Sequence, residues 1–524
     1  MVVEQPQALE WPDELKSVLQ HFVQPDSTLS SCGSPVLALL SRIHTLLLSP
    51  APRSLAQATH IAAHLLRLAN DLLNAVPYKD VPLSSRRLYT DAALLGALAR
   101  VGPSKSASDV EQLCLAVRDC DLAIVIAGAP GERREDLALE LIQLAQARLG
   151  ASARDDGLRP AKRARVAPPR RRARAPAPYV DRPMPTLPAL PSFLPSPSPS
   201  PSSTPSTPFV VRAALADSDA VARWTSLAYL RAAAGPARVV PVEVGGDYTA
   251  EGWGQRMMDF GAFVDALERA DEEVVVAREG KQARDKEDEP DKRPERPRET
   301  LYLAQHALFR QLPALRRDLP LPDLVYSPPA LDDDGAPYVA PQGPDGDGVV
   351  LNAWLGPGGT TSRAHTDPYW NCYVQVVGSK WIWVAPPDCA PYMAAFGSTS
   401  GDGGGEDEDE DGSAPSEAGK DGEAQAAAQS YMTNTSTLDV TVPPPPRAPS
   451  PRAPSTSSSS AARLDPPDGR APRAAAAYPP AFLDQVVPRA FQAVLEPGDV
   501  LVLPPRWWHS LVSLETSFSV SMWF

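Results

Sequence analysis

The sequence predicts an α + β protein, with an all-α domain at its N-terminus and a β-rich domain at its C-terminus. Two observations support this prediction. Apolar residues recur every three or four positions in residues 1–150, whereas short runs of β-branched and aromatic residues recur in residues 209–397 and 478–524. The length of 524 residues is sufficient for two or three domains.

The composition excludes several classes of protein. The formal net charge of −14 argues against a general polyanion binder, so we expect no nucleic acid as a direct ligand. Five cysteines without a Cys-x-x-Cys pair favour a reducing compartment and argue against structural zinc. No apolar stretch approaches the roughly 18 residues that span a bilayer, and residues 1–4 lack the features of a signal peptide. We therefore expect neither secretion nor a membrane partner.

The first 150 residues contain four segments with a helical apolar stripe. Prolines fall between these segments, where they interrupt no helical hydrogen bond. We expect helices at Pro35–Leu48, Leu55–Val76, Ser84–Val101 and Glu132–Leu149. His60 and His64 have the spacing of a helical zinc pair, but Ile61 stands where a metalloprotease has its glutamate, so helix packing is the better interpretation.

Residues 151–208 are predicted to form a disordered linker between the two domains. The stretch is first basic and then rich in proline and serine, a composition that buries too little apolar surface to fold. The basic cluster Lys162–Arg174 is typical of a nuclear-import signal, which predicts a nuclear protein, with a cytoplasmic pool as the alternative. Incidental disorder without a targeting role is the first alternative for this cluster. A nucleic-acid tether is a weaker one, because no aromatic residues are interleaved for base stacking.

The C-terminal domain is predicted to consist of short strands interrupted by two insertions. We expect a helix at Trp253–Leu267 and strands at Val239–Val244, Val349–Leu355, Asn371–Val377, Trp381–Val384, Ala493–Leu495, Val500–Leu503 and Phe518–Trp523. The mixed-charge run 284–299 indicates a solvated surface insertion. The low-complexity block 398–477 is interpreted as a disordered insertion that catalysis does not need, so that 209–397 and 478–524 form one catalytic domain.

One group of residues in this domain predicts a metal site. His365 and Asp367 are two positions apart, so on a strand both side chains face the same way, and His509 follows a strand far downstream. Two imidazoles and one carboxylate form the facial triad of non-haem Fe(II) oxygenases and leave three coordination positions open. A zinc hydrolase uses the same residue types, so the triad alone does not identify the metal.

Lys380 is a second indicator of chemistry. It follows a Gly-Ser turn and precedes the apolar run Trp381–Val384, which predicts a cation beside a buried wall. Because an unpaired buried ammonium is costly, an anionic partner is expected, and a dicarboxylic co-substrate would provide one. The alternative is an exposed hairpin lysine.

Longer motifs around these residues resemble the jumonji-C (JmjC) family of Fe(II)- and 2-oxoglutarate-dependent oxygenases. The resemblance is carried by Leu351–Pro368, Asn371–Lys380 and Glu496–His509. Val240–Gly245 and Tyr302–His306 make the chain most similar to the small JmjC enzymes described both as lysine-specific histone demethylases and as peptidyl-arginine hydroxylases. The likeness covers residues 239–391 and 493–524 and is weaker at 79–95.

The resemblance implies a fold, cofactors and a set of site residues. The implied fold is a C-terminal double-stranded β-helix, the jelly-roll or cupin-like barrel of JmjC domains, and the implied reaction uses Fe(II), 2-oxoglutarate and O2. The implied catalytic residues and metal ligands are His365, Asp367 and His509, the implied 2-oxoglutarate contacts are Lys380, Tyr302, Ser362, Asn371 and Trp523, and the implied substrate contacts are Glu243 and Trp354.

The residues leave three functions open. Arginyl hydroxylation of a protein or peptide is favoured, because Glu243 can pair with a planar guanidinium and Trp354 can stack on it. The alternatives for these two residues are a surface strand residue and a core aromatic. Demethylation of a methyl-lysyl side chain, for example on a histone, would use the same site. A catalytically inert barrel that serves as an interaction module is the third function, although such a module has no chemical need for the triad and Lys380.

Overall fold

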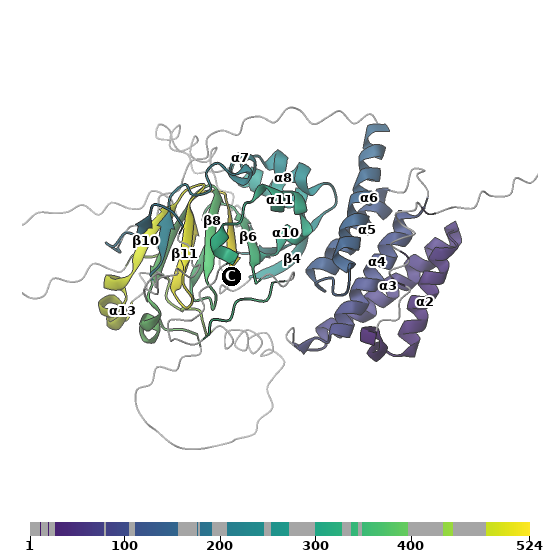
Figure 1. Ribbon diagram of the computed structural model, residues 1–524, viewed down its shortest axis with the longest axis horizontal. Helices are drawn as coiled ribbons and strands as arrows, with labels where there is room; N and C mark the ends of the chain where they lie inside the picture. The colour runs from purple at the N-terminus through teal and green to yellow at the C-terminus, as the bar shows by residue number, and fades with distance from the viewer. Residues whose placement is uncertain are drawn as a thin grey trace, which may run out of the picture.

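The computed structural model shows a bundle of helices beside a larger domain built around two sheets (Figure 1). The structure describes Trp11, Leu19 and Phe22 together with residues 27–77, 80–103, 110–155, 176, 179–190, 207–245, 253–271, 299–326, 337–343, 348–396, 433–443 and 478–524. The predicted nuclear-import signal Lys162–Arg174 lies outside these residues, as does the charged insertion 284–299 apart from Glu299. None of the described helices combines the length and apolarity needed to cross a membrane.

The described part of the N-terminal domain is entirely helical. Its elements are η1 (Ser27–Cys32), α2 (Ser34–Leu48), α3 (Pro52–Asn74), α4 (Leu83–Val101), α5 (Val110–Val125) and α6 (Arg134–Asp155). The four predicted helices are confirmed, with ends that shift by a few residues. Nearly all of α4 is buried because it packs against α3, α5 and α6. The sequence does not predict α5, because Arg118, Asp119 and the buried Asp121 interrupt its apolar stripe.

The C-terminal domain is built from two sheets. The larger has the strand order β1-β2-β11-β8-β13-β6-β5-β3-β4, and the smaller has the order β10-β9-β12-β7. The strands are β1 (Thr186–Leu187), β2 (Phe209–Val211), β3 (Val239–Val244), β4 (Gly254–Asp259), β5 (Leu301–His306), β6 (Val350–Gly356), β7 (Thr361–His365), β8 (Asn371–Val377), β9 (Lys380–Ala385), β10 (Phe491–Leu495), β11 (Val500–Leu503), β12 (Trp508–Ser513) and β13 (Ser517–Trp523).

The two sheets face each other across a shared core. Tyr373 and Leu501 of the larger sheet belong to the same buried cluster as Ile382 and Leu511 of the smaller sheet. The chain alternates between the sheets from β6 to β9 and again from β10 to β13. This alternation is the winding of a double-stranded β-helix, so the predicted fold class is confirmed.

Short helices cover the side of the larger sheet that is nearest to the helical domain (Figure 1). They are α7 (Asp219–Arg223), α8 (Leu227–Ala234), a helix at 260–271, α10 (Leu308–Gln311), α11 (Pro313–Asp318) and η3 (Asp323–Tyr326). The buried carboxylate of Asp318 accepts hydrogen bonds from Trp224 Nε1 at 3.0 Å and from Tyr229 Oη at 2.6 Å, which ties α11 to α8 and to the end of α7. The remaining helical elements are η4 (Pro387–Tyr392), α13 (Pro480–Gln485) and η6 (Val487–Arg489).

The predicted helix at Trp253–Leu267 is wrong in its first half. Residues Gly254–Asp259 form β4, which pairs with the whole of β3 from Val239↔Asp259 to Val244↔Gly254, and the helix begins only at residue 260. The backbone hydrogen bonds to β3 override the helical preference that the local spacing of apolar residues indicates. No pattern within the segment itself reveals this pairing.

The structure departs from the predicted disordered linker at 151–208. Residues 151–155 continue α6, and β1 pairs in parallel with β2. Val180 and Met184 are buried, and Met184 N donates to the carbonyl of Gln492 at 2.8 Å. Residues 180–187, in the middle of the predicted linker, therefore pack on the barrel rather than only connecting two domains.

The structure also departs from the predicted continuous insertion at 398–477. Residues 433–443 lie against β7, the edge strand of the smaller sheet. Ser436 N donates to Ala364 O at 2.8 Å, and Thr366 N donates to Asn434 O at 3.0 Å. An edge strand leaves backbone N–H and C=O groups without partners. The backbone of Asn434 and Ser436 provides partners for two of these groups.

Candidate metal and co-substrate site

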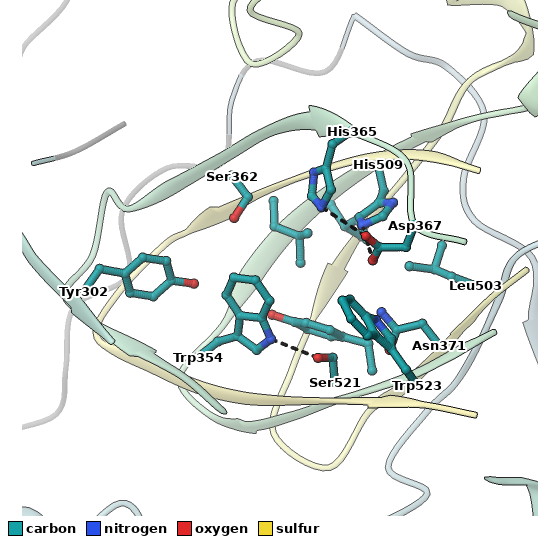
Figure 2. A pocket seen from close by; sticks show the side chains of 13 residues that line it. Tyr302, Trp354, Ser362, His365, Asp367, Asn371, Leu503, His509, Ser521 and Trp523 are labelled. Atoms are coloured by element: carbon teal, nitrogen blue, oxygen red, sulfur yellow. Dashed lines mark hydrogen bonds and ion pairs between the residues drawn. The ribbon is translucent and has the colours of Figure 1, made fainter. Parts of the chain in front are cut away.

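His365, Asp367 and His509 come together in one pocket (Figure 2). His365 is the last residue of β7, and His509 lies opposite to it on β12. Asp367 lies two residues beyond the end of β7, so the prediction of one shared strand is wrong for Asp367. Its carboxylate oxygens lie 3.9 Å from His365 Nε2 and 3.5 Å from His509 Nε2. Because the three candidate ligand atoms lie within 4.8 Å of one another, one cation could contact all of them.

The backbone fixes the orientation of both imidazoles. His365 Nδ1 lies 2.7 Å from the carbonyl oxygen of Arg363, and His509 Nδ1 lies 3.0 Å from the carbonyl oxygen of Trp507. An Nδ1–H that donates to a carbonyl leaves the lone pair on Nε2, which is the tautomer that binds a metal. Both Nε2 atoms face Asp367 (Figure 2).

Burial and mutual contact set the charge of each member of the triad. Burial and the neighbouring His509 lower the pKa of His365 to about 4, so its imidazole is neutral near pH 7. Burial acts to raise the pKa of Asp367, but the hydrogen bond and charge of His509 outweigh it and lower that pKa. For His509, burial acts to lower the pKa, but Asp367 outweighs it and raises the pKa. An ionised carboxylate and two imidazoles together form a set of ligands that suits a divalent cation.

The turn between β11 and β12 holds the backbone of Asp367. Arg506 N donates to the carbonyl oxygen of Asp367 at 2.7 Å, and Arg506 itself has a φ of 64°. A non-glycine residue in this left-handed region costs about 1–3 kcal/mol, and such strain clusters at functional sites. The turn that leads into His509 therefore also positions the loop that carries Asp367.

Lys380 begins β9 and is only 2% exposed. Its Nζ donates to Tyr373 Oη at 3.1 Å and to Tyr302 Oη at 3.3 Å. Burial lowers the pKa of Lys380 to about 7, and no carboxylate of the described residues counteracts this shift. The alternative of an exposed hairpin lysine is therefore wrong.

The structure brings most of the predicted site residues into the same pocket. Tyr302, Ser362, Asn371, Trp523 and Trp354 line it together with the triad (Figure 2). Trp354 Nε1 donates to Ser521 Oγ at 3.0 Å, which holds the indole at the pocket wall. The side-chain Oδ1 of Asn371 is buried and has no hydrogen-bond partner among the described residues.

Glu243 lies next to this pocket but does not line it. On β3 it stands opposite Tyr302 of β5, and its carboxylate accepts a hydrogen bond of 3.4 Å from Trp253 Nε1. Burial raises the pKa of Glu243, although hydrogen bonds from Trp253 and Gln255 act to lower it. The side chain is thus half-buried beside a pocket residue, rather than a freely exposed strand residue.

Five residues of the pocket were not predicted from the sequence. They are Tyr373, Ile382, Leu503, Leu511 and Ser521. Tyr373 stands two positions after Asn371 on a predicted strand, so the alternation of strand side chains could have placed it on the same face. Apolar side chains carry no chemical signal, and only the tertiary structure identifies those that reach the pocket.

Comparison with known proteins identifies the family. The sequence matches the family described as "Cupin-like domain" over residues 202–524, which is more than half of the chain. The chain belongs to this family. The match contains both sheets apart from β1, and it confirms the resemblance on which the predicted barrel depends.

Curated relatives of this cupin-like chain carry JmjC or demethylase names. The chain is 28% identical over 310 residues to Jumonji C domain-containing protein 5 of Drosophila melanogaster, which covers 58% of this chain and 51% of that protein. It is 36% identical over 163 residues to Lysine-specific demethylase 8 of Danio rerio, covering 31% and 30% of the two chains. It is 27% identical over 322 residues to Lysine-specific demethylase JMJ30 of Arabidopsis thaliana, covering 61% and 50%. The chain thus spans about half the length of these relatives, or less.

Proposed function

We propose that this cupin-like protein is an Fe(II)- and 2-oxoglutarate-dependent oxygenase that hydroxylates a protein side chain. The observation that carries the proposal is the convergence of His365, Asp367 and His509 in a pocket whose tyrosines contact the buried ammonium of Lys380. A stable barrel needs neither a cluster of titratable groups nor a buried lysine, so an inert interaction module does not account for them.

The residues present fit both implied groups. Two histidines and one carboxylate with open positions suit Fe(II). Lys380 is a buried cation without a carboxylate partner among the described residues, which suits the distal carboxylate of a dicarboxylic acid. The amide of Asn371 has a buried polar atom without a protein partner in the described structure, and an amide can turn either its oxygen or its nitrogen toward a ligand.

The chain's own residues would hold the reactants and exclude water. Bound Fe(II) would supply the oxygen chemistry, in which 2-oxoglutarate and O2 yield succinate, CO2 and a hydroxyl group on a substrate carbon. The imidazoles of His365 and His509 present Nε2 lone pairs, and Asp367 supplies a compensating negative charge. Ile382, Leu503 and Leu511 give the pocket apolar walls, which strengthen every charge interaction inside it.

We infer that the substrate side chain is arginyl. Trp354 lines the pocket, and the half-buried carboxylate of Glu243 lies beside Tyr302 at its edge. A carboxylate can accept two parallel hydrogen bonds from a guanidinium, and an indole can lie against its planar face.

A methyl-lysyl side chain is the second candidate substrate. Two of the relatives are named as lysine-specific demethylases, and a hydroxylated N-methyl group loses formaldehyde. Histone peptides are then the first substrates to test, because the basic cluster Lys162–Arg174 supports a nuclear location.

Mass analysis of peptides tests the proposal. The full chain is incubated with Fe(II), ascorbate and 2-oxoglutarate in air, together with arginine-containing or methyl-lysine-containing histone peptides. A gain of one oxygen atom on arginine supports hydroxylation, and loss of a methylene group with release of formaldehyde supports demethylation. No succinate from the wild-type chain with any peptide would contradict the proposal.

The variant Asp367→Ala should abolish succinate formation, because it removes the charged member of the triad. The matched control is Asp388→Ala, which removes a carboxylate that is 71% exposed, outside the pocket, and should leave turnover unchanged. Undiminished succinate formation by Asp367→Ala would show that these three residues do not hold the metal.

A further inference from the structure

We propose that Tyr373 is a second positioning residue for the co-substrate, and that its ring sets the depth of the pocket in favour of 2-oxoglutarate over the one-carbon-longer 2-oxoadipate. This inference rests on the proposed function, because it concerns the acid that binds beside Lys380. It assigns a role to a residue that the motifs do not single out.

The hydroxyl of Tyr373 shares the ammonium of Lys380 with Tyr302. A lysine ammonium has three N–H donors, and two of them point to the phenol oxygens of Tyr373 at 3.1 Å and Tyr302 at 3.3 Å. Lys380 is 2% exposed and Tyr373 is 5% exposed, so water does not compete freely for these bonds. One donor is left, and its direction is determined by the other two. The two phenols together therefore leave one N–H of Lys380 for the carboxylate of the proposed co-substrate.

A chain of buried hydrogen bonds holds the strand that carries Tyr373. Ser519 of β13 lies opposite Gln375 of β8, and its hydroxyl donates to Gln375 Oε1 at 2.9 Å. The amide nitrogen of Gln375 donates to the carbonyl oxygens of Val377 at 2.8 Å and Gly378 at 3.1 Å. The Tyr373 hydroxyl accepts from the ammonium of Lys380, and Gln375, two residues further along β8, ties that strand to the turn that follows it.

This chain of bonds returns to the turn that carries Lys380. Val377 and Gly378 lie immediately before Ser379 and Lys380 in the β8–β9 connection. Ser519 and Gln375 have no exposed surface, and Gly378 adopts a φ of 67° against the carbonyl of Thr516, where a side chain would clash. Both ends of the Lys380–Tyr373 contact are therefore held by the same rigid turn and strand.

The ring of Tyr373 also limits the space of the pocket on the side where its hydroxyl meets Lys380. Tyr373 lines the pocket and packs with Ile382, Leu501 and Leu511 in the core between the sheets. A shorter side chain at this position would enlarge the pocket beside the ammonium, and a longer dicarboxylic acid would gain the room for one more methylene group. One methylene changes discrimination in an apolar pocket by roughly 10–200-fold.

Two variants separate the two roles of Tyr373. Tyr373→Phe keeps the ring and removes the hydroxyl, and Tyr373→Leu removes the ring. Binding of 2-oxoglutarate and of 2-oxoadipate to the full chain loaded with Mn(II) is measured by calorimetry, without turnover. The control Tyr326→Phe removes a hydroxyl from a tyrosine that is 53% exposed and should change neither constant.

For Tyr373→Phe we expect 2-oxoglutarate to bind roughly ten- to a hundredfold more weakly, with Mn(II) affinity unchanged, because one hydrogen bond to a charged group is lost. For Tyr373→Leu we expect the ratio of the two dissociation constants to shift toward 2-oxoadipate by roughly tenfold or more. An unchanged 2-oxoglutarate constant in Tyr373→Phe, or an unchanged ratio in Tyr373→Leu, would overturn the corresponding role. If the wild-type chain with Mn(II) binds no 2-oxoglutarate at all, the proposed function fails rather than the role of Tyr373.

Discussion

At the scale of single residues, the most informative feature of the candidate site is the environment of Lys380, which does not line the pocket itself but contacts two tyrosines that do. Its ammonium is buried against two phenol oxygens, and no carboxylate of the described residues lies beside it to compensate its charge. A buried cation without a carboxylate beside it destabilises the ligand-free protein, because no negative charge compensates the cost of removing the ammonium from water. A negatively charged ligand would remove that imbalance, which links the stability of the fold to the proposed co-substrate.

Lys380→Ala should weaken 2-oxoglutarate binding by roughly ten- to several-hundredfold, because a hydrogen bond to a charged group contributes about 1.5–3 kcal/mol or more when its partner is left buried. Iron affinity should change little, since Lys380 is not in the triad. Lys380→Arg should rescue binding only partly, because the guanidinium fork needs more room than an ammonium. Dissociation constants for the wild type and both variants provide the measurement. An unchanged constant in Lys380→Ala would place the distal carboxylate elsewhere.

The lowered pKa of Lys380 predicts a pH dependence of stability. The ordinary lysine pKa of 10.5 applies to the unfolded chain, and burial lowers the folded value to about 7. Between these two values the unfolded chain holds a proton that the folded chain does not. The penalty is therefore complete below pH 7 and disappears as the pH rises toward 10.5. Lys380→Met should therefore raise the free energy of unfolding of the ligand-free protein by a few kcal/mol at pH 7, which is the order of magnitude that this pKa shift implies. The gain should be smaller at pH 9.

Urea unfolding of both chains at the two pH values measures this difference. Lys380→Arg, which keeps the charge at both pH values, serves as the control. A stability difference between Lys380→Met and the wild type that does not shrink from pH 7 to pH 9 would contradict the buried, uncompensated ammonium.

At the scale of elements, residues 433–443 complete the edge of the smaller sheet. Thr435 pairs with His365 as an isolated bridge, and Ser436 N donates to the neighbouring Ala364. On the other side of the segment, Val440 is 1% exposed within a core cluster, and Tyr478 Oη hydrogen-bonds to Val442 O at 2.5 Å. A segment in the middle of a low-complexity region thus packs directly on the strand that ends at a candidate metal ligand.

Replacing residues 433–443 by a Gly/Ser stretch of equal length should lower metal affinity roughly 10–100-fold, the usual effect of losing groups that orient metal ligands. The matched control removes residues 398–432. Phe396 N donates to Thr435 O at 2.9 Å, so the two ends of that deletion lie close together and a short linker can join them. Titration with Mn(II) measures both chains. Equal affinity in the two would show that the segment does not position His365.

At the scale of the whole molecule, a buried ion pair joins the helical domain to the barrel. Arg238, directly before β3, pairs with Asp121 of α5 at 2.7 Å, with side chains that are 5% and 0% exposed. Asp121 also accepts from Gln311 Nε2 at 2.8 Å and from the backbone N of Val239 at 2.9 Å. The first residue of the strand that carries Glu243 is thereby held by the N-terminal domain, so the two domains form one structural unit at this point.

Asp121→Ala should lower the free energy of unfolding by about 3–5 kcal/mol, because it leaves the Arg238 guanidinium buried without its charge partner. Asp265→Ala is the matched control, since Asp265 is 52% exposed and its pairing with Arg231 contributes only about 0–1 kcal/mol. Chemical unfolding of the two variants and the wild type provides the measurement. Similar losses in both variants would mean that the contact between the domains is solvated in solution.

The sequence by itself predicted the triad, Lys380 and the strand β9 that begins at Lys380, but it did not predict β7 and β12, which carry the two histidines. Metal and carboxylate binding require particular residue types at particular spacings, and such signals are local and chemically specific. The helices of the N-terminal domain could also be predicted from the sequence, because one apolar stripe suffices to predict each of them. The exception is α5, whose buried Asp121 makes sense only once Arg238 is opposite to it.

The tertiary structure alone decided which residues complete these features. β4 exists because it pairs with β3, and residues 433–443 are ordered against the open edge of β7. Tyr373 reaches Lys380 because the turn between β8 and β9 folds one strand across to the other sheet. In each case the stabilising partner is distant in sequence or lies on another strand, and the spacing of residues within one segment does not encode which partner it will meet.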